Sequence, residues 1–233
     1  EYMRKIAIIS DIHANVINFK KVLEDLEKRK IYEIIFLGDY ILDGFANNEV
    51  LDIIKHQNTL AVVLGNKEEF FCEEDFDVSK YNTEQFRNVV YAYKNLSIEN
   101  LFYIRNLPKY KILEIEGQKI LCTHGIPTYT RENFREEKYE KFDRLIEDYD
   151  FNIYLYGHTH EENFEEYKNH CFINPSSLGM PLENKPGAKY GILTIDRANV
   201  EYEQIILEVD YKEVEKQYKN SDYYKAYIMY VYP

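Results

Sequence analysis

Short apolar runs alternate with amphipathic stretches through the first third of the chain. Residues 4–9, 32–37 and 60–64 are rich in β-branched residues, which is typical of strands buried on both faces. Between the first two runs, from Val16 to Leu26, apolar residues recur every three or four positions, the spacing of one helix face. A further helical stretch over 48–55 precedes the third run. The order of strand, helix and strand predicts parallel βαβ units and therefore an α/β fold.

The rest of the chain divides into a helical segment, a series of short strands and a tail. Residues 78–108 have helical spacing without a strand, and we interpret them as a helical insertion or cap. A charged helix is expected over 138–149. Further strands are expected over 110–115, 119–122, 151–156, 163–167, 171–173, 190–195 and 200–207. We expect residues 210–233 to form a helical tail, and residues 1–233 to form a single domain.

Polar side chains stand where the predicted strands end. These residues are Asp11, His13, Asp39, Asn66, His124, His158 and His160. They include four of the six histidines, the others being His56 and His170. Because the carboxyl ends of parallel strands share one edge of a sheet, we expect the seven side chains to meet. We expect Gly157 to let the backbone turn sharply as it leaves its strand. The competing interpretations are a helix cap at Asp11 and a surface turn with solvated histidines at 157–160.

The chemistry of these seven side chains indicates a metal centre. Nitrogen and oxygen donors without a thiolate suit Mn, Fe or Zn, and we expect Mn, with Fe, Zn or Ni as alternatives. Seven donors are too many for one tetrahedral ion. They fit two ions that share a carboxylate, the arrangement with which two-metal hydrolases hold phosphoryl groups at a metal separation of roughly 3.5–4 Å.

The ordered motifs resemble those of a known family. The segments Asp11-Ile12-His13, Gly38-Asp39, Gly65-Asn66, His124-Gly125 and Gly157-His158-Thr159-His160 resemble the five blocks of the calcineurin-like metallophosphoesterase superfamily. Residues 174–181 are similar to the closing motif of its small prokaryotic phosphodiesterases. The resemblance implies a four-layer α-β-β-α sandwich with two central mixed sheets and the metal site at the C-terminal ends of the strands. It assigns one metal to Asp11, His13, Asp39 and His160, and the other to Asp39, Asn66, His124 and His158, with Asp39 as the bridge.

The resemblance also implies an activity. We expect metal-dependent hydrolysis of a small phosphodiester, nucleotide-type or other, by a hydroxide held between the ions, with Asp39, Asn66, Lys67 and His124 as catalytic residues. Hydrolysis of dinucleoside polyphosphates or of phosphomonoesters is an alternative. An alternative of another class is a non-catalytic scaffold with this fold, which arises when the ligands decay. A sugar- or nucleoside-binding module would not need four histidines at strand ends.

The motifs depart from the family pattern at three places. Protein phosphatases of the superfamily carry GDxVDRG, whereas residues 38–44 read GDYILDG, with the second Asp shifted and no Arg. Leu182 stands where an Arg often follows the closing Pro. Many members have His after the metal-binding Asn, and this chain has Lys67. We expect Lys67 to bind a phosphate oxygen as a point charge, the alternatives being a proton donor or a solvated lysine at a helix start.

Composition limits the partners and the compartment. A net charge of −12 argues against duplex nucleic acid and anionic membranes, yet two divalent ions would still attract a small phosphorylated substrate. The three cysteines, Cys72, Cys122 and Cys171, have no metal-type spacing and predict free thiols in the cytoplasm. No signal peptide or membrane span is expected. Tyrosines from Tyr211 onward suit an interface, including one in a homo-oligomer, although terminal helices more often pack on their own domain.

Overall fold

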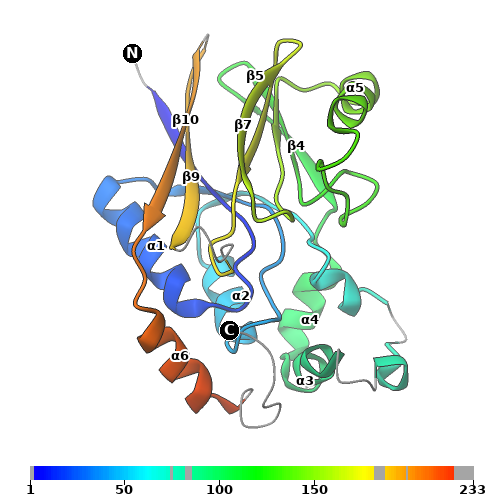
Figure 1. Cartoon of the computed structure of the whole chain (residues 1–233), viewed down its shortest axis with the longest axis vertical. Coiled ribbons are helices and arrows are strands. Elements are labelled where there is room, and N and C mark those ends of the chain that lie inside the picture. The colour runs from blue at the N-terminus through cyan, green and yellow to red at the C-terminus, as the bar shows by residue number, and fades with distance from the viewer. Residues whose placement is uncertain (1–2, 74–75, 82–85, 181–186, 198, 223–233) are drawn as a thin grey trace.

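Two mixed sheets form the centre of the computed structural model, which describes residues 3–73, 76–81, 86–180, 187–197 and 199–222 (Figure 1). The first sheet contains, in spatial order, β10 (Asn199–Leu207), β9 (Ala188–Asp196), β1 (Arg4–Ile9), β2 (Glu33–Phe36) and β3 (Thr59–Val62). The second sheet contains β4 (Tyr110–Ile115), β5 (Gln118–Thr123), β6 (Ile153–Leu155), β8 (His170–Pro175) and β7 (Glu162–Tyr167).

Parallel strands occupy the middle of both sheets. β1, β2 and β3 are parallel, with Ile8 opposite Ile35, and β5, β6 and β8 are parallel, with Tyr154 opposite Phe172. The remaining strands, β9, β10, β4 and β7, pair antiparallel. Within each sheet, the parallel strands that precede the polar motifs therefore end at the same edge, as the sequence predicts.

Helices cover the outer faces of the two sheets. The α-helices are α1 (Val16–Arg29), α2 (Asn47–Lys55), α3 (Arg87–Asn95), α4 (Ile98–Arg105), α5 (Lys138–Asp148) and α6 (Tyr211–Asn220), and the 3₁₀ helices are η1 (Glu68–Phe71) and η2 (Val78–Tyr81). Figure 1 shows α1, α2 and α6 on the side of the first sheet and α5 beside the second. The four-layer α-β-β-α sandwich is confirmed.

Three apolar layers hold this sandwich together. Phe19 of α1 and Leu51 of α2 are buried with Phe36 against the first sheet. Another layer, which includes Ile8 and Ile35, fills the space between the sheets. A third layer packs α5 on the second sheet, where the rings of Phe142 and Phe172 stack with centroids 3.6 Å apart. Burial of these faces is the main stabilisation of the arrangement and fixes the relative position of the strand ends.

Helix α1 begins at Asn15 rather than at Asp11. The Asn15 side chain accepts a hydrogen bond from the backbone N–H of Asn18 at 3.1 Å and donates to Gly179 O at 3.0 Å. Asn18 donates to Leu178 O at 3.0 Å. The capping interpretation of Asp11 is therefore wrong, and its carboxylate is available for another role.

Helices also form the described part of residues 78–108, namely η2, α3 and α4. Asn100 is buried and donates to Asn48 and Asp52 of α2, which attaches this segment to the helical side of the first sheet. α6 packs through buried Val214 and Tyr218, and residues 223–233 of the expected tail lie outside the described part. The described helices include none long and apolar enough to cross a lipid bilayer.

Candidate metal centre

The loops that carry the predicted ligands have an unusual backbone conformation. Asp11, His13, Asp39, His158 and His160 all have positive φ, with values of 56°, 48°, 56°, 68° and 57°. This conformation is uncommon for residues other than glycine, costs on the order of 1–3 kcal/mol each, and concentrates at functional sites. The sequence contains no signal for it. The surrounding hydrogen bonds must therefore hold these loops in place.

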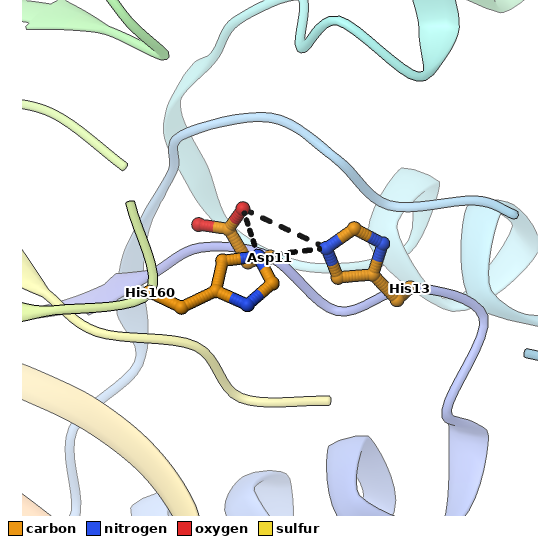
Figure 2. Close-up of side chains that lie close together, drawn as sticks. All are labelled: Asp11, His13 and His160. Atoms are coloured by element: carbon orange, nitrogen blue, oxygen red, sulfur yellow. Dashed lines mark hydrogen bonds and ion pairs between the residues drawn. The ribbon is translucent and has the colours of Figure 1, made fainter. Parts of the chain in front are cut away.

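Asp11, His13 and His160 form the first donor group (Figure 2). The Nε2 atoms of the two histidines lie 3.1 Å apart, and Asp11 Oδ1 lies 3.1 Å from His160 Nε2 and 3.7 Å from His13 Nε2. Asp11 and His13 are buried, whereas the His160 side chain is 18% exposed. Of the three side chains, His160 is therefore the one in contact with solvent.

The two oxygens of Asp11 have different surroundings. Oδ2 accepts hydrogen bonds from Ser10 Oγ at 2.5 Å and from the backbone N–H of His158 at 3.1 Å. Oδ1 is buried and accepts no hydrogen bond from any residue that the structure describes. A buried carboxylate oxygen without a hydrogen bond is costly unless a cation or donor faces it. This oxygen, directed toward two imidazole nitrogens, is what a metal ion requires, so the donor set fits the implied ion.

Asp39, His124 and His158 form the second donor group. His124 Nε2 lies 3.3 Å from Asp39 Oδ1 and 3.0 Å from Asn66 Oδ1, and the rings of His124 and His158 meet edge to face with centroids 5.2 Å apart. His124, Asp39 and Asn66 are buried, and His158 is partly exposed. The amide oxygen of Asn66 is thus part of the same cluster.

Asp39 lies between the two groups. Its Oδ1 is the oxygen that faces His124, and its Oδ2 lies 3.9 Å from His13 Nε2. A carboxylate in this position has one oxygen for each group. All seven predicted donors are therefore brought together, and the arrangement is compatible with the predicted bridging role of Asp39.

Outer contacts orient the buried histidines. His124 Nδ1 donates to the carbonyl oxygen of Leu37 at 2.7 Å, so Nε2, which lies 3.3 Å from Asp39 Oδ1 and 3.0 Å from Asn66 Oδ1, is the nitrogen that would bind a metal once its proton is displaced. His13 Nδ1 lies 3.2 Å from Asp43 Oδ2. A carboxylate or carbonyl behind the ring is the usual way to orient a metal-binding imidazole.

The carboxylates also determine the protonation of this site in the metal-free protein. Burial alone would lower the pKa of His13, but Asp11, Asp43 and Asp39 outweigh it and raise that pKa to about 10. The same balance, with Asp39 as the main partner, raises the pKa of His124 to about 9. Conversely, the imidazoles, led by His160, hold the pKa of Asp11 well below its usual range despite its burial. Protons thus occupy the metal-free site, and a metal has to displace them.

Lys67 points back toward the first group rather than lying free in solvent. Its Nζ lies 2.6 Å from Asp43 Oδ2, and its backbone N–H donates to Asp39 Oδ1 at 2.9 Å. The Lys67 side chain is 25% exposed. Asp43 is the shifted second Asp of residues 38–44, and only the tertiary structure reveals its contact with Lys67.

Two motif glycines allow the strand ends to approach each other. A Cβ at Gly65 would lie 2.1 Å from Asp39 N, and a Cβ at Gly157 would lie 2.0 Å from Ser10 Oγ. Gly157 does not have positive φ; the residues with left-handed backbone are His158 and His160. The expectation that Gly157 supplies a sharp turn is therefore wrong, because its role is to leave room beside β1.

Glu68 is a structural residue of the site that the sequence did not reveal. It is completely buried, and its carboxylate accepts four backbone N–H bonds, from Gly65, Asp39, Tyr40 and Ile41, at 2.8–3.2 Å. These bonds hold the loop after β2 against the loop after β3. Burial, with the nearby Asp39 carboxylate, raises the pKa of Glu68 to about 7. Its only sequence signal is its position two residues after Asn66.

The closing motif fixes the loop that carries His158 and His160. The Asn174 side chain donates to Gly157 O at 2.9 Å and to Thr159 Oγ1 at 3.1 Å. Ser176 Oγ donates to His160 O at 2.7 Å. Pro181 and Leu182, at the end of this motif, lie outside the described residues.

Comparison with known proteins identifies the family. Residues 4–198 match the model of the calcineurin-like phosphoesterase superfamily domain. The chain belongs to this superfamily. An uncharacterized protein of Methanocaldococcus jannaschii is 29% identical over an alignment 238 residues long, and the alignment covers 92% of each chain. A phosphodiesterase of the same organism is 25% identical over 204 residues, covering 88% of this chain and 99% of that protein.

Two solved structures have the same fold. A metallophosphoesterase from Sphaerobacter thermophilus aligns with a TM-score of 0.75 and 21% identity, covering 93% of each chain. A hypothetical protein from Pyrococcus horikoshii aligns with a TM-score of 0.78 and 20% identity, covering 93% of this chain and 92% of that one. The superfamily is metal-dependent, and the two donor groups are this chain's candidate metal sites.

Proposed function

We propose that this superfamily member is a phosphodiesterase that acts on a small phosphodiester with two metal ions. The observation that carries the proposal is the position of Asp39, whose Oδ1 lies 3.3 Å from His124 Nε2 and whose Oδ2 lies 3.9 Å from His13 Nε2. One carboxylate between two donor groups is the arrangement that a two-metal hydrolase requires. The chemistry supplied by two such ions is acidification of a water nucleophile and stabilisation of charge on the phosphate oxygens.

The protein residues have distinct proposed roles. We assign Asp11, His13, Asp39 and His160 to one ion, and Asp39, Asn66, His124 and His158 to the other, with Mn²⁺ as the expected metal. The partly exposed His158 and His160 place the open side of the centre on the loop after β6, where the substrate would enter. Lys67, held by Asp43, would direct an ammonium hydrogen at a phosphate oxygen.

Two considerations favour this function over the alternatives. The relative named phosphodiesterase supports a diester substrate over a phosphomonoester or a dinucleoside polyphosphate. A non-catalytic scaffold would tolerate the loss of donors, whereas all seven are present and six of them belong to the two clusters. We also propose a cytoplasmic location, because Cys72, Cys122 and Cys171 are free thiols.

Metal analysis combined with a substrate panel tests the proposal. The protein, reconstituted with Mn²⁺, is assayed with bis(p-nitrophenyl) phosphate, p-nitrophenyl phosphate and diadenosine tetraphosphate. We expect two equivalents of metal, fastest hydrolysis of the diester, loss of activity with a chelator and recovery with Mn²⁺. Hydrolysis that survives prolonged chelation would contradict the two-metal mechanism. A metal-loaded protein that is inert to all three substrates would support the scaffold instead.

A further inference from the structure

Arg131 lies beside the candidate metal centre on the segment between β5 and α5. Its Nη2 donates to the backbone oxygen of Asn66 at 3.3 Å, and its guanidinium lies over the Phe70 ring, 5.3 Å from the centroid. Among the described residues, no carboxylate oxygen lies within 4 Å of this guanidinium. Most of its N–H groups remain available to a ligand.

The backbone before and after Arg131 is fixed. Ile126 and Tyr129 exchange two backbone hydrogen bonds at 3.0 and 3.1 Å, which forms a tight turn. Thr130 is buried and its Oγ1 donates to Glu69 Oε2 at 2.7 Å. On the other side, the Glu132 carboxylate is bound by Lys141 Nζ at 2.9 Å. The guanidinium is therefore presented by a fixed segment, which reduces the entropy lost when it binds a ligand.

Arg131 differs in this respect from the other cation of the site. Lys67 Nζ is 2.6 Å from Asp43 Oδ2, so its charge is balanced within the protein. Among the described residues, Arg131 has no ion-pair partner of this kind, and its guanidinium contacts the Asn66 backbone oxygen and the Phe70 ring instead. A guanidinium also offers two parallel N–H groups, which match two oxygens of a phosphate better than an ammonium does.

There is also room for a ligand beside Arg131. A hollow of about 360 Å³ is lined by Arg131 and Lys109, by Glu69 and Glu73, and by Leu64, Phe70, Cys72 and Tyr81. Within it, the Glu69 carboxylate is bound by Lys109 Nζ at 3.2 Å and by Thr130 Oγ1 at 2.7 Å. This volume lies within the range of small-molecule sites. Arg131, which lines the hollow, also donates to the backbone oxygen of Asn66, whose side-chain oxygen lies 3.0 Å from His124 Nε2 of the second donor group.

We propose that Arg131 binds the phosphate group of the substrate through two N–H groups. The inference rests on the proposed function for the identity of the substrate, although binding of phosphate itself does not require hydrolysis. In this role Arg131 takes the place of the arginine that is missing from residues 38–44, but from a different loop of the fold. It is a substrate-binding residue and not a metal ligand.

Isothermal titration calorimetry with inorganic phosphate tests the proposal. The wild-type protein, Arg131→Gln, Arg131→Lys and Arg135→Gln are titrated both after Mn²⁺ reconstitution and after chelation. Arg135 is the matched control, because it lies on the same segment but pairs with Glu161 at 3.1 Å and is 59% exposed. We expect Arg131→Gln to weaken phosphate binding roughly 10- to 100-fold, Arg131→Lys to recover part of the loss, and Arg135→Gln to bind as the wild type does.

The outcomes separate this inference from the proposed function. Equal phosphate affinity in Arg131→Gln and the wild type, or no phosphate binding by the wild type, would overturn the role of Arg131. If the variants lose phosphate binding as expected but none of the proteins hydrolyses a phosphodiester, the proposed function fails and the phosphate site stands. In an active enzyme, Arg131→Gln should raise KM for bis(p-nitrophenyl) phosphate by a factor similar to the loss of phosphate affinity. An unchanged KM would also overturn the role of Arg131.

Discussion

Lys67 Nζ lies 2.6 Å from Asp43 Oδ2, and the same oxygen lies 3.2 Å from His13 Nδ1. One carboxylate thus orients both a candidate metal ligand and the Lys67 ammonium beside the candidate metal centre. Burial opposes the charge of Lys67, but the carboxylates of Asp43 and Asp39 outweigh it and raise the pKa of Lys67 in the metal-free protein. A lysine held in its charged form is suited to binding a phosphate oxygen and is a poor proton donor.

We therefore predict that Lys67→Ala reduces the hydrolysis of alkyl and nitrophenyl diesters by the same factor. Loss of one charged contact should lower kcat/KM roughly 10- to 100-fold. Nitrophenolate leaves without protonation whereas an alkoxide needs a proton, so comparison of the two substrates isolates acid catalysis. Lys20→Ala is the control, because Lys20 is exposed and pairs with Glu49 on the helical side. A much larger loss for the alkyl ester would show that Lys67 donates a proton.

Asp39→Asn should weaken both metal sites together. The substitution removes the negative charge that lies between the two donor groups, so each ion loses an anionic ligand. We expect metal content, measured by mass spectrometry after dialysis, to fall from two equivalents toward none, with hydrolysis lost in parallel. The exposed Asp150→Asn variant has the same charge change and should retain both metals. Two retained equivalents in Asp39→Asn would rule out the bridging role.

Metal binding should release protons and strengthen with rising pH. The pKa of His13 is raised to about 10 and that of His124 to about 9, so both rings are protonated at neutral pH before the metal binds. At pH values below these two pKa values, the apparent affinity for the metal rises with pH. For each proton displaced, the rise is up to about tenfold per pH unit.

Titration of Mn²⁺ in buffers of different ionisation enthalpy measures the protons released. His13→Gln should release about one proton fewer than the wild type. His56→Gln should match the wild type, since His56 lies at the end of α2, outside both donor groups. Proton release that is zero, or affinity that is independent of pH from 6 to 8, would contradict this prediction.

Gly65→Ala should disrupt the metal centre through the backbone. Its Cβ would lie 2.1 Å from Asp39 N and 2.3 Å from Asp39 Oδ1, so the loop after β2 has to move. We expect metal affinity to fall at least about tenfold, as it does when contacts that orient ligands are lost. Gly117→Ala is the control, because its φ is +79° and no atom lies within 4 Å of the added Cβ. That variant should lose about 1–2 kcal/mol of stability and keep both metals.

Much of the fold and of the donor set could be predicted from the sequence. The apolar runs that form β1, β2 and β3 are local patterns, and the polar residue after each run is read directly from its position. Parallel pairing then brings the strand ends together, because right-handed crossovers orient successive strands alike. For this reason the sequence places Asp11 and Asp39 in one cluster, whereas His124 follows β5 of the other sheet and joins them because the two sheets pack together.

The contacts around those donors were decided by the tertiary structure alone. Glu68 binds the loop after β2, Asp43 joins His13 to Lys67, and Arg131 reaches Asn66 from a segment 65 residues away in the chain. No periodicity connects such positions, because a side chain finds these partners only when separate loops pack against one another. The positive φ of the ligand loops has the same origin, since strained backbone persists only where the surrounding hydrogen bonds hold it.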